Sequence, residues 1–150
     1  MKPVTVETTI QRPIEQVYDH LDVLANHEAF TDHFLTDWRP SGPERGVGSE
    51  MHLKMKPGGQ ELHITVIEAV RPERTVERTV SGGGRRSSLG TYRLRPVGES
   101  ATHVTFEMAA ESMPAYECPL APLLMGYVRK QNARAMERLK EQLERAAAPA

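Results

Sequence analysis

The sequence predicts a single α+β domain, in which a curved antiparallel sheet of about seven strands wraps a long C-terminal helix. Apolar and polar residues alternate with a period of two in most segments between residues 4 and 108. Glycine- and proline-rich turns separate these segments. Strong helix formers dominate residues 122–146, and the 150 residues suit one domain that spans positions 1–150.

The first strand is expected at residues 4–10, where valine, isoleucine and threonine alternate with polar residues. Pro13 follows at a position typical of the first turn of a helix, and Ile14, Val17 and Leu21 share one helical face. A second short helix is expected between residues 22 and 34. A strand around Trp38 should then lead into the middle of the sheet.

Two hairpins are expected in the middle of the chain. A turn at residues 57–60 lets Met55 pair with Leu62, which places the apolar residues of both strands on one face. A second turn near residue 72 lets Glu68 pair with Arg78 on that same inner face. Within positions 62–108, the even-numbered side chains are then expected to face inward.

The last hairpin turns around residues 97–99 and pairs Leu94 with Val104 and Tyr92 with Phe106. The opposite face of these strands carries charges and threonines, so the sheet should be covered on one side only.

The long helix at residues 122–146 is the element that covers the sheet. Its apolar residues, with Leu120 just before it, cluster on one side at the 3.6-residue period: Leu120, Leu123, Leu124, Tyr127, Val128, Ala135, Leu139 and Leu143. Gln131 falls within this apolar stripe. Because an unpaired buried amide is costly, Gln131 should either bond to the sheet or reach into a cavity, and the sequence leaves both open.

Composition excludes several classes of function. The formal net charge is −1, with 19 basic and 20 acidic residues, so nucleic acid is not an expected partner. The only cysteine, Cys118, has no partner for an internal disulfide. We expect a cytoplasmic protein, because the first 13 residues lack the apolar core of a signal peptide and no apolar stretch is long enough to span a membrane.

Neither a metal nor a cofactor is expected. The sequence has six histidines, but none forms a motif with the spacing of metal ligands. His52 and His63 are expected outside, opposite Thr65 and Lys54 respectively. No serine elbow or phosphate-binding loop is present in the sequence, and Cys118 has no histidine placed beside it.

Three segments give the sequence a family resemblance: the opening VTVE to RPIEQV (residues 4–17), the strand end VIEAVRPER (66–74) and the run from PLAPLL to LK (119–140). In this order they resemble the helix-grip fold of the START-related SRPBCC superfamily, in particular its polyketide cyclase/dehydrase and lipid-transport branch. The resemblance covers nearly the whole chain. It implies a deep pocket between helix and sheet, which different members use for lipids, quinones, polyketides or plant hormones, and it implies no single reaction.

The candidate ligand-binding residues are those expected on the inner face of the sheet, on the helices and around the strand at Trp38: Phe30, Phe34, Trp38, Met51, Leu53, Ile64, Val66, Arg78, Tyr92, Phe106, Met108, Leu124, Val128 and Gln131. The seven methionines favour an adaptable apolar lining. Arg78, Tyr92 and Glu68 are the candidate catalytic residues, although Glu68 and Arg78 are also explained by a structural ion pair.

Two functions therefore compete. The first is binding or transport of a small hydrophobic ligand, such as a lipid, a polyketide or a quinone-like molecule. The second is a metal-free polyketide cyclase or aromatase, in which Arg78, Tyr92 or Glu68 would promote enolisation of a ligand in the same cavity. Ligand identity and oligomeric state are left open, a homodimer included.

Overall fold

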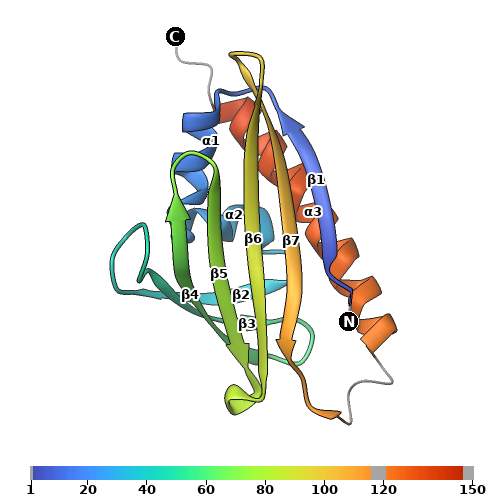
Figure 1. Ribbon diagram of the computed structural model, residues 1–150. Coiled ribbons are helices and arrows are strands. Elements are labelled where there is room, and N and C mark those ends of the chain that lie inside the picture. The colour runs from blue at the N-terminus through green and yellow to red at the C-terminus, as the bar shows by residue number, and fades with distance from the viewer. Residues whose placement is uncertain (1, 116–120, 147–150) are drawn as a thin grey trace.

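A seven-stranded antiparallel sheet curves around a long C-terminal helix in the computed structural model (Figure 1). The structure describes residues 2–115 and 121–146, so Cys118 and Leu120 lie outside the described residues. The strands are ordered β1-β7-β6-β5-β4-β3-β2 across the sheet. This arrangement is the helix-grip α+β fold that the sequence predicts.

The elements follow the predicted order. They are β1 (Val4–Ile10), α1 (Ile14–Leu21), η1 (Leu24–His27), α2 (Glu28–Thr31), β2 (Leu35–Ser41), β3 (Glu50–Met55), β4 (Gln60–Val70), β5 (Arg74–Ser81), η2 (Gly82–Gly84), β6 (Arg86–Val97), β7 (Ala101–Ser112) and α3 (Ala121–Ala146). Pro13 precedes α1 as expected. The second short helix of the sequence prediction is divided into η1 and α2.

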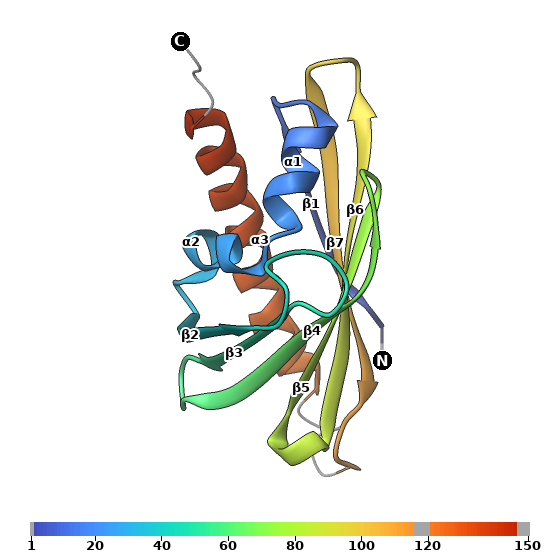
Figure 2. The ribbon, with the colours of Figure 1, turned by 90° about the vertical axis from the view of Figure 1, so that its left-hand side faces the viewer.

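The helices α1, α2 and α3 lie on the concave side of the sheet, whereas η2 forms the turn between β5 and β6. Figure 2 shows α1, α2 and α3 on this side, with the strands bending around them. The buried core has two parts. One packs α1 and the second half of α3 against β1, β6 and β7, and includes Tyr18, Val104, Met136 and Leu139. The other lies between η1 and strands β2 to β4. The cavity described below adjoins both parts.

The pairing of β3 with β4 differs from the predicted register by two residues. Leu53 pairs with Leu62 and Met55 pairs with Gln60, so Met55 does not face Leu62. The reason is a tighter turn, in which the Gly59 amide donates to the Met55 carbonyl oxygen at 3.0 Å. Because side chains alternate with a period of two, a shift of two residues keeps each side chain on its predicted face. The predicted division of these side chains into core and surface is therefore right, although the predicted cross-strand partners are wrong.

The predicted pairing of β4 with β5 is also wrong, and here the error places side chains of β5 on the wrong face of the sheet. A bulge between Val66 and Glu68 shifts the register, so Glu68 pairs with Val76 and Val66 pairs with Glu77. Thr75 lies opposite the inward-facing Tyr92 of β6, which places the odd-numbered residues of β5 on the concave face. Glu77 therefore points inward and Arg78 points outward, the reverse of the sequence prediction.

The buried face of α3 contains a polar residue, as the helical pattern predicts, but it is a different residue from the predicted one. Ala135, Leu139 and Leu143 are buried as predicted, and Met136 joins them. Asn132 is 4% exposed, whereas Gln131 is only half-buried. The predicted polar position inside the stripe therefore exists, but Asn132 occupies it.

Candidate ligand-binding cavity

A cavity of about 330 Å³ lies between the concave face of the sheet, the short helices and α3. Its wall is mostly apolar, with hydroxyl groups concentrated on the sheet side. The lining residues are His27, Thr31, Phe34, Leu35, Trp38, Met55, Gln60, Leu62, Ile64, Glu77, Thr79, Ser81, Arg86, Ser87, Ser88, Tyr92, Phe106, Met108, Ala110, Ser112, Met113, Leu124, Met125, Asn132, Ala135 and Met136. This is the composition expected of a small-molecule site.

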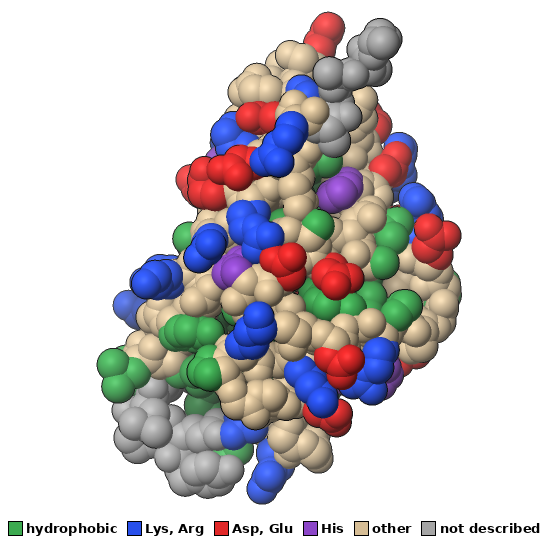
Figure 3. Space-filling model, turned by 180° about the vertical axis from the view of Figure 1, so that it is seen from behind, with side chains coloured by type: hydrophobic (Ala, Val, Ile, Leu, Met, Phe, Trp, Pro, Cys, Tyr) green, Lys and Arg blue, Asp and Glu red, His purple; other side chains and the backbone are tan. Residues whose placement is uncertain are grey.

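The beginning of α3 forms one end of this wall. Leu124 and Met125 line the cavity, and Leu123 is 78% exposed. On the face shown in Figure 3, apolar side chains gather at this end of the molecule, and acidic and basic side chains intermix over most of the rest of that face.

Half of the predicted ligand-binding residues line the cavity: Phe34, Trp38, Ile64, Tyr92, Phe106, Met108 and Leu124. Phe30, Met51, Leu53 and Val66 do not line it, because they are buried in the core next to it. Val128 and Gln131 also lie outside the lining; the Gln131 backbone carbonyl oxygen accepts a hydrogen bond from His33 at 3.2 Å. Core and lining residues are chemically alike, so the pattern alone does not separate them.

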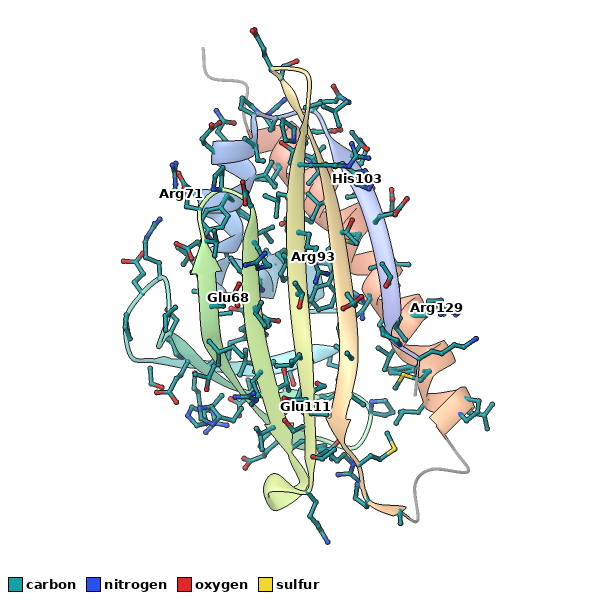
Figure 4. All side chains as sticks on the ribbon, in the orientation of Figure 1. Glu68, Arg71, Arg93, His103, Glu111 and Arg129 are labelled. Atoms are coloured by element: carbon teal, nitrogen blue, oxygen red, sulfur yellow. The ribbon has the colours of Figure 1, made fainter. Side chains whose placement is uncertain are left out.

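Arg78 and Glu68 form no inner ion pair. Arg78 donates two hydrogen bonds to Glu111, at 2.9 and 3.1 Å, and Glu68 accepts one from Arg74 at 2.5 Å. Figure 4 shows Glu68 near the C-terminal end of β4 and Glu111 near the C-terminal end of β7, well apart on the sheet. Neither residue of the predicted pair lines the cavity, so the structure provides no basis for the catalytic roles considered for Arg78 and Glu68.

Glu77 is the acidic residue that the bulge brings into the cavity. Within the described residues its carboxylate has no hydrogen-bond or ion-pair partner, and burial raises its pKa from 4.5 to about 7. A carboxyl group with such a pKa changes its protonation state near neutral pH, which is a property of catalytic and ligand-binding acids.

The sequence does contain a signal for Glu77. Thr75, Glu77, Thr79 and Ser81 alternate with Val76 and Val80, so β5 has one polar and one partly apolar face. The usual interpretation places the valines inside. In the structure the polar face is the inner one, because it borders a cavity and not a packed core.

Gly90 makes room for this arrangement. Gly90 lies on β6, opposite Glu77 on β5 and opposite Met108 on β7. A Cβ atom at Gly90 would lie 2.9 Å from the Phe106 ring and 3.3 Å from Cγ of Glu77. The absence of a side chain at this position therefore allows both neighbours to occupy the concave face.

Tyr92 and His27 form an aromatic corner of the cavity. The Tyr92 ring lies 4.4 Å from the Phe106 ring and 5.6 Å from the His27 ring, edge-on to the latter. Burial, together with the nearby Glu77 carboxylate, raises the pKa of the Tyr92 hydroxyl well above 10. The Tyr92 hydroxyl therefore stays protonated and can donate a hydrogen bond to a ligand.

His27 is held in its neutral form. Its Nε2–H donates to the Leu21 carbonyl oxygen at 2.7 Å, and burial lowers its pKa from 6.5 to about 4. The proton on Nε2 leaves Nδ1 as an acceptor. His27 therefore contributes an uncharged ring to the cavity wall at neutral pH.

Asn132 supplies a polar group from the helix side of the cavity. Its side-chain nitrogen Nδ2 is buried and has no hydrogen-bond partner among the described residues. Such an unpaired buried donor costs about 1–3 kcal/mol, a cost that an acceptor in the cavity would remove. Sequence reasoning missed Asn132 because one position along a helix rotates a side chain by about 100°.

Among the described residues, no helix is both long and apolar enough to cross a membrane.

The family described as "Polyketide cyclase / dehydrase and lipid transport" matches residues 1–144 of the chain. A search of curated proteins finds no match.

Solved structures with the same fold come from several sources. A conserved protein from Geobacillus kaustophilus superposes with a TM-score of 0.76 at 12% identity, covering 97% of each chain. Norcoclaurine synthase from Thalictrum flavum, solved in complex with dopamine and hydroxybenzaldehyde, gives 0.73 at 13% identity and covers 98% of this chain and 88% of that one. DynU16, a putative protein of the dynemicin biosynthetic locus, gives 0.67 at 18% identity; 96% of this chain matches 48% of it. At these identities the superpositions show the fold alone.

Proposed function

The chain belongs to the polyketide cyclase/dehydrase and lipid transport family, and we propose that its cavity binds a small, mostly apolar molecule that carries a hydrogen-bonding group. The observation that carries the proposal is the placement of three of the polar groups that line the mostly apolar cavity: the Glu77 carboxyl, the Tyr92 hydroxyl and the Asn132 amide. A well-packed core would leave none of them without a partner. A ligand with one polar end would satisfy them and would fill the apolar space.

The cavity volume limits the size of the ligand. At about 330 Å³, it lies near the lower end of the range of roughly 300–1,000 Å³ typical of small-molecule sites. It therefore suits a compact molecule of one or two rings, such as a small polyketide or a quinone-like compound, better than a lipid with two long chains.

The placement of the polar groups suggests how such a ligand would be oriented. Glu77 and Tyr92 lie on the neighbouring strands β5 and β6, and Glu77 faces Gly90, two residues from Tyr92 along β6. They are therefore diagonal neighbours on one face of the sheet. Asn132 lies on α3, on the helix side of the cavity. A carbonyl or hydroxyl group between helix and sheet would meet donors from both.

Enzymatic activity is the second candidate function, and Glu77 is the observation that favours it. A carboxyl group with a pKa of about 7 is suited to remove and return a proton near neutral pH. The Tyr92 hydroxyl, which stays protonated, could stabilise an enolate oxygen. The cyclase-type mechanism would then depend on Glu77 and Tyr92, and Arg78 and Glu68 would take no part.

Binding is tested with an apolar fluorescent probe and with native mass spectrometry of protein purified from its own host. We expect the probe to be taken up and Asn132→Leu and Glu77→Gln to change its affinity, whereas Arg78→Ala, on the outer face of the same strand as Glu77, should leave it unchanged. Failure of the wild-type protein to take up any probe or to carry any co-purified molecule would contradict the proposal.

The same variants separate a carrier from an enzyme. Once the co-purified molecule is identified, an enzyme with Glu77→Gln should retain binding and lose turnover of that molecule. A carrier should leave the molecule unchanged in both the wild type and the variant.

A further inference from the structure

The outer face of the sheet carries a second cluster of chemically active side chains, separate from the cavity. Glu50 and His52 lie two residues apart on β3, and His63 lies on β4. Their inward-facing neighbours Met51 and Leu53 are fully buried, so the three side chains point outward. The corrected register places His52 directly opposite His63, where the sequence analysis expected Thr65.

The three side chains converge. The His63 Nε2 atom lies 2.6 Å from Glu50 Oε1, and the His52 and His63 rings stack with centroids 4.3 Å apart and planes 7° apart. One potential ligand atom from each residue can be chosen so that all three lie within 4.8 Å of one another. Ligand atoms of a tetrahedral zinc ion lie about 3.3 Å apart, given metal–ligand bonds of about 2.0–2.1 Å. Because the nitrogen lone pairs lie in the ring planes, metal binding requires His52 and His63 to rotate out of their stacked arrangement until these lone pairs converge on one ion.

We propose that Glu50, His52 and His63 bind a divalent transition-metal ion, for which Zn²⁺ is the probe. Two imidazoles and one carboxylate are ligands that suit Zn²⁺, Cu²⁺ and Ni²⁺, whereas Mg²⁺ and Ca²⁺ prefer oxygen atoms alone. Three protein ligands leave a fourth position for water or another exchangeable ligand.

Access and charge are compatible with this site. His52 and His63 line a surface hollow of about 410 Å³, next to the turn at Gly82–Gly84. Arg39 lines the same hollow and is the nearest competing positive charge on β2. Its guanidinium is 3.5 Å from the Asp37 carboxylate and 3.7 Å from that of Glu61, which offset its charge.

A metal ion at this position would connect two strands whose other face lines the cavity. Leu62 and Ile64, which flank His63 on β4, are both lining residues. Because the ligands come from separate strands, the ion would bind the folded state more tightly than the unfolded state. Zinc should therefore raise the melting temperature of the protein.

The experiment is a calorimetric titration of tag-free protein with ZnCl₂, together with thermal unfolding with and without zinc. We expect one saturable site per chain and a zinc-dependent rise in melting temperature. His52→Ala and His63→Ala should each weaken binding at least about tenfold and remove most of that rise. MgCl₂ should have no comparable effect.

Two controls make the result specific. His103→Ala removes another outer-face histidine with a carboxylate nearby, that of Glu7 at 3.7 Å, and should leave zinc binding unchanged. Cys118→Ser removes the only thiol and should also leave it unchanged. The proposal is overturned if zinc shows no saturable binding, or if binding persists undiminished in both His52→Ala and His63→Ala. Each variant is compared with its own zinc-free melting temperature, so a loss of the Glu50–His63 contact alone does not imitate the result.

Discussion

Glu77 lies directly across the β5–β6 pair from Gly90, and its side chain occupies space that any larger residue at position 90 would enter. The same missing side chain admits the Phe106 ring. One glycine thus sets the shape of the cavity wall around its acidic residue.

Gly90→Ala should destabilise the protein. The added Cβ would lie 2.9 Å from Cε1 of Phe106, so the ring must move or the strands must separate. We expect a loss of about 1–3 kcal/mol in the free energy of unfolding, measured by urea denaturation. Gly126→Ala in α3 is the control, because a Cβ there meets nothing within 4 Å. It should stabilise the helix by up to about 1 kcal/mol. Equal effects of the two substitutions would show that Gly90 is not tightly enclosed.

Glu77→Gln should change how stability depends on pH. The pKa of Glu77 is raised to about 7 in the folded state from an ordinary value of 4.5. Between these values the folded protein keeps a proton that the unfolded chain releases, so wild-type stability falls as pH rises through this window. The free energy of unfolding of the variant minus that of the wild type should therefore be about 1–2 kcal/mol larger at pH 8 than at pH 5. A constant difference between the two proteins from pH 5 to pH 8 would show that Glu77 does not titrate there.

His27 should have the opposite effect on the acid side. Its pKa is lowered to about 4 from 6.5, so the unfolded chain binds a proton that the folded protein does not. The stabilising contribution is complete above pH 6.5 and is lost as pH falls through 6.5 towards 4. His27→Gln should therefore flatten the stability profile over this range by about 2 kcal/mol, measured by chemical denaturation at a series of pH values. A stability profile of His27→Gln that runs parallel to that of the wild type from pH 4 to pH 6.5 would contradict this prediction.

Ala135→Phe should fill the cavity. Ala135 is 4% exposed and lines the cavity from α3, whereas Ala133 on the same helix is exposed. The phenylalanine at position 135 should reduce the affinity for an apolar fluorescent probe at least about tenfold, or about 1.4 kcal/mol. Ala133→Phe should leave affinity unchanged. Circular dichroism of both variants checks that they are folded, and equal probe binding by the two would place the probe outside the cavity.

Much of the candidate site could be predicted where a strand follows the usual pattern. Tyr92 and Phe106 were paired correctly, because β6 and β7 turn inward the faces that carry their large apolar residues. The proposed metal site could not be predicted, since the expected register separates His52 from His63 and only the tighter turn brings the two together. A two-residue change in register leaves every face intact and yet changes every neighbour.

The sequence by itself determined the order of the elements, the sheet with one covered face and the long helix that covers it. Periodicity and turn residues are local properties, and they specify these features without reference to distant contacts. The tertiary structure alone decided which polar residues enter the cavity. The bulge between Val66 and Glu68 turns Glu77 inward and Arg78 outward, and the rotation of α3 buries Asn132 in place of Gln131. Both choices depend on how separate elements pack, which no local pattern records.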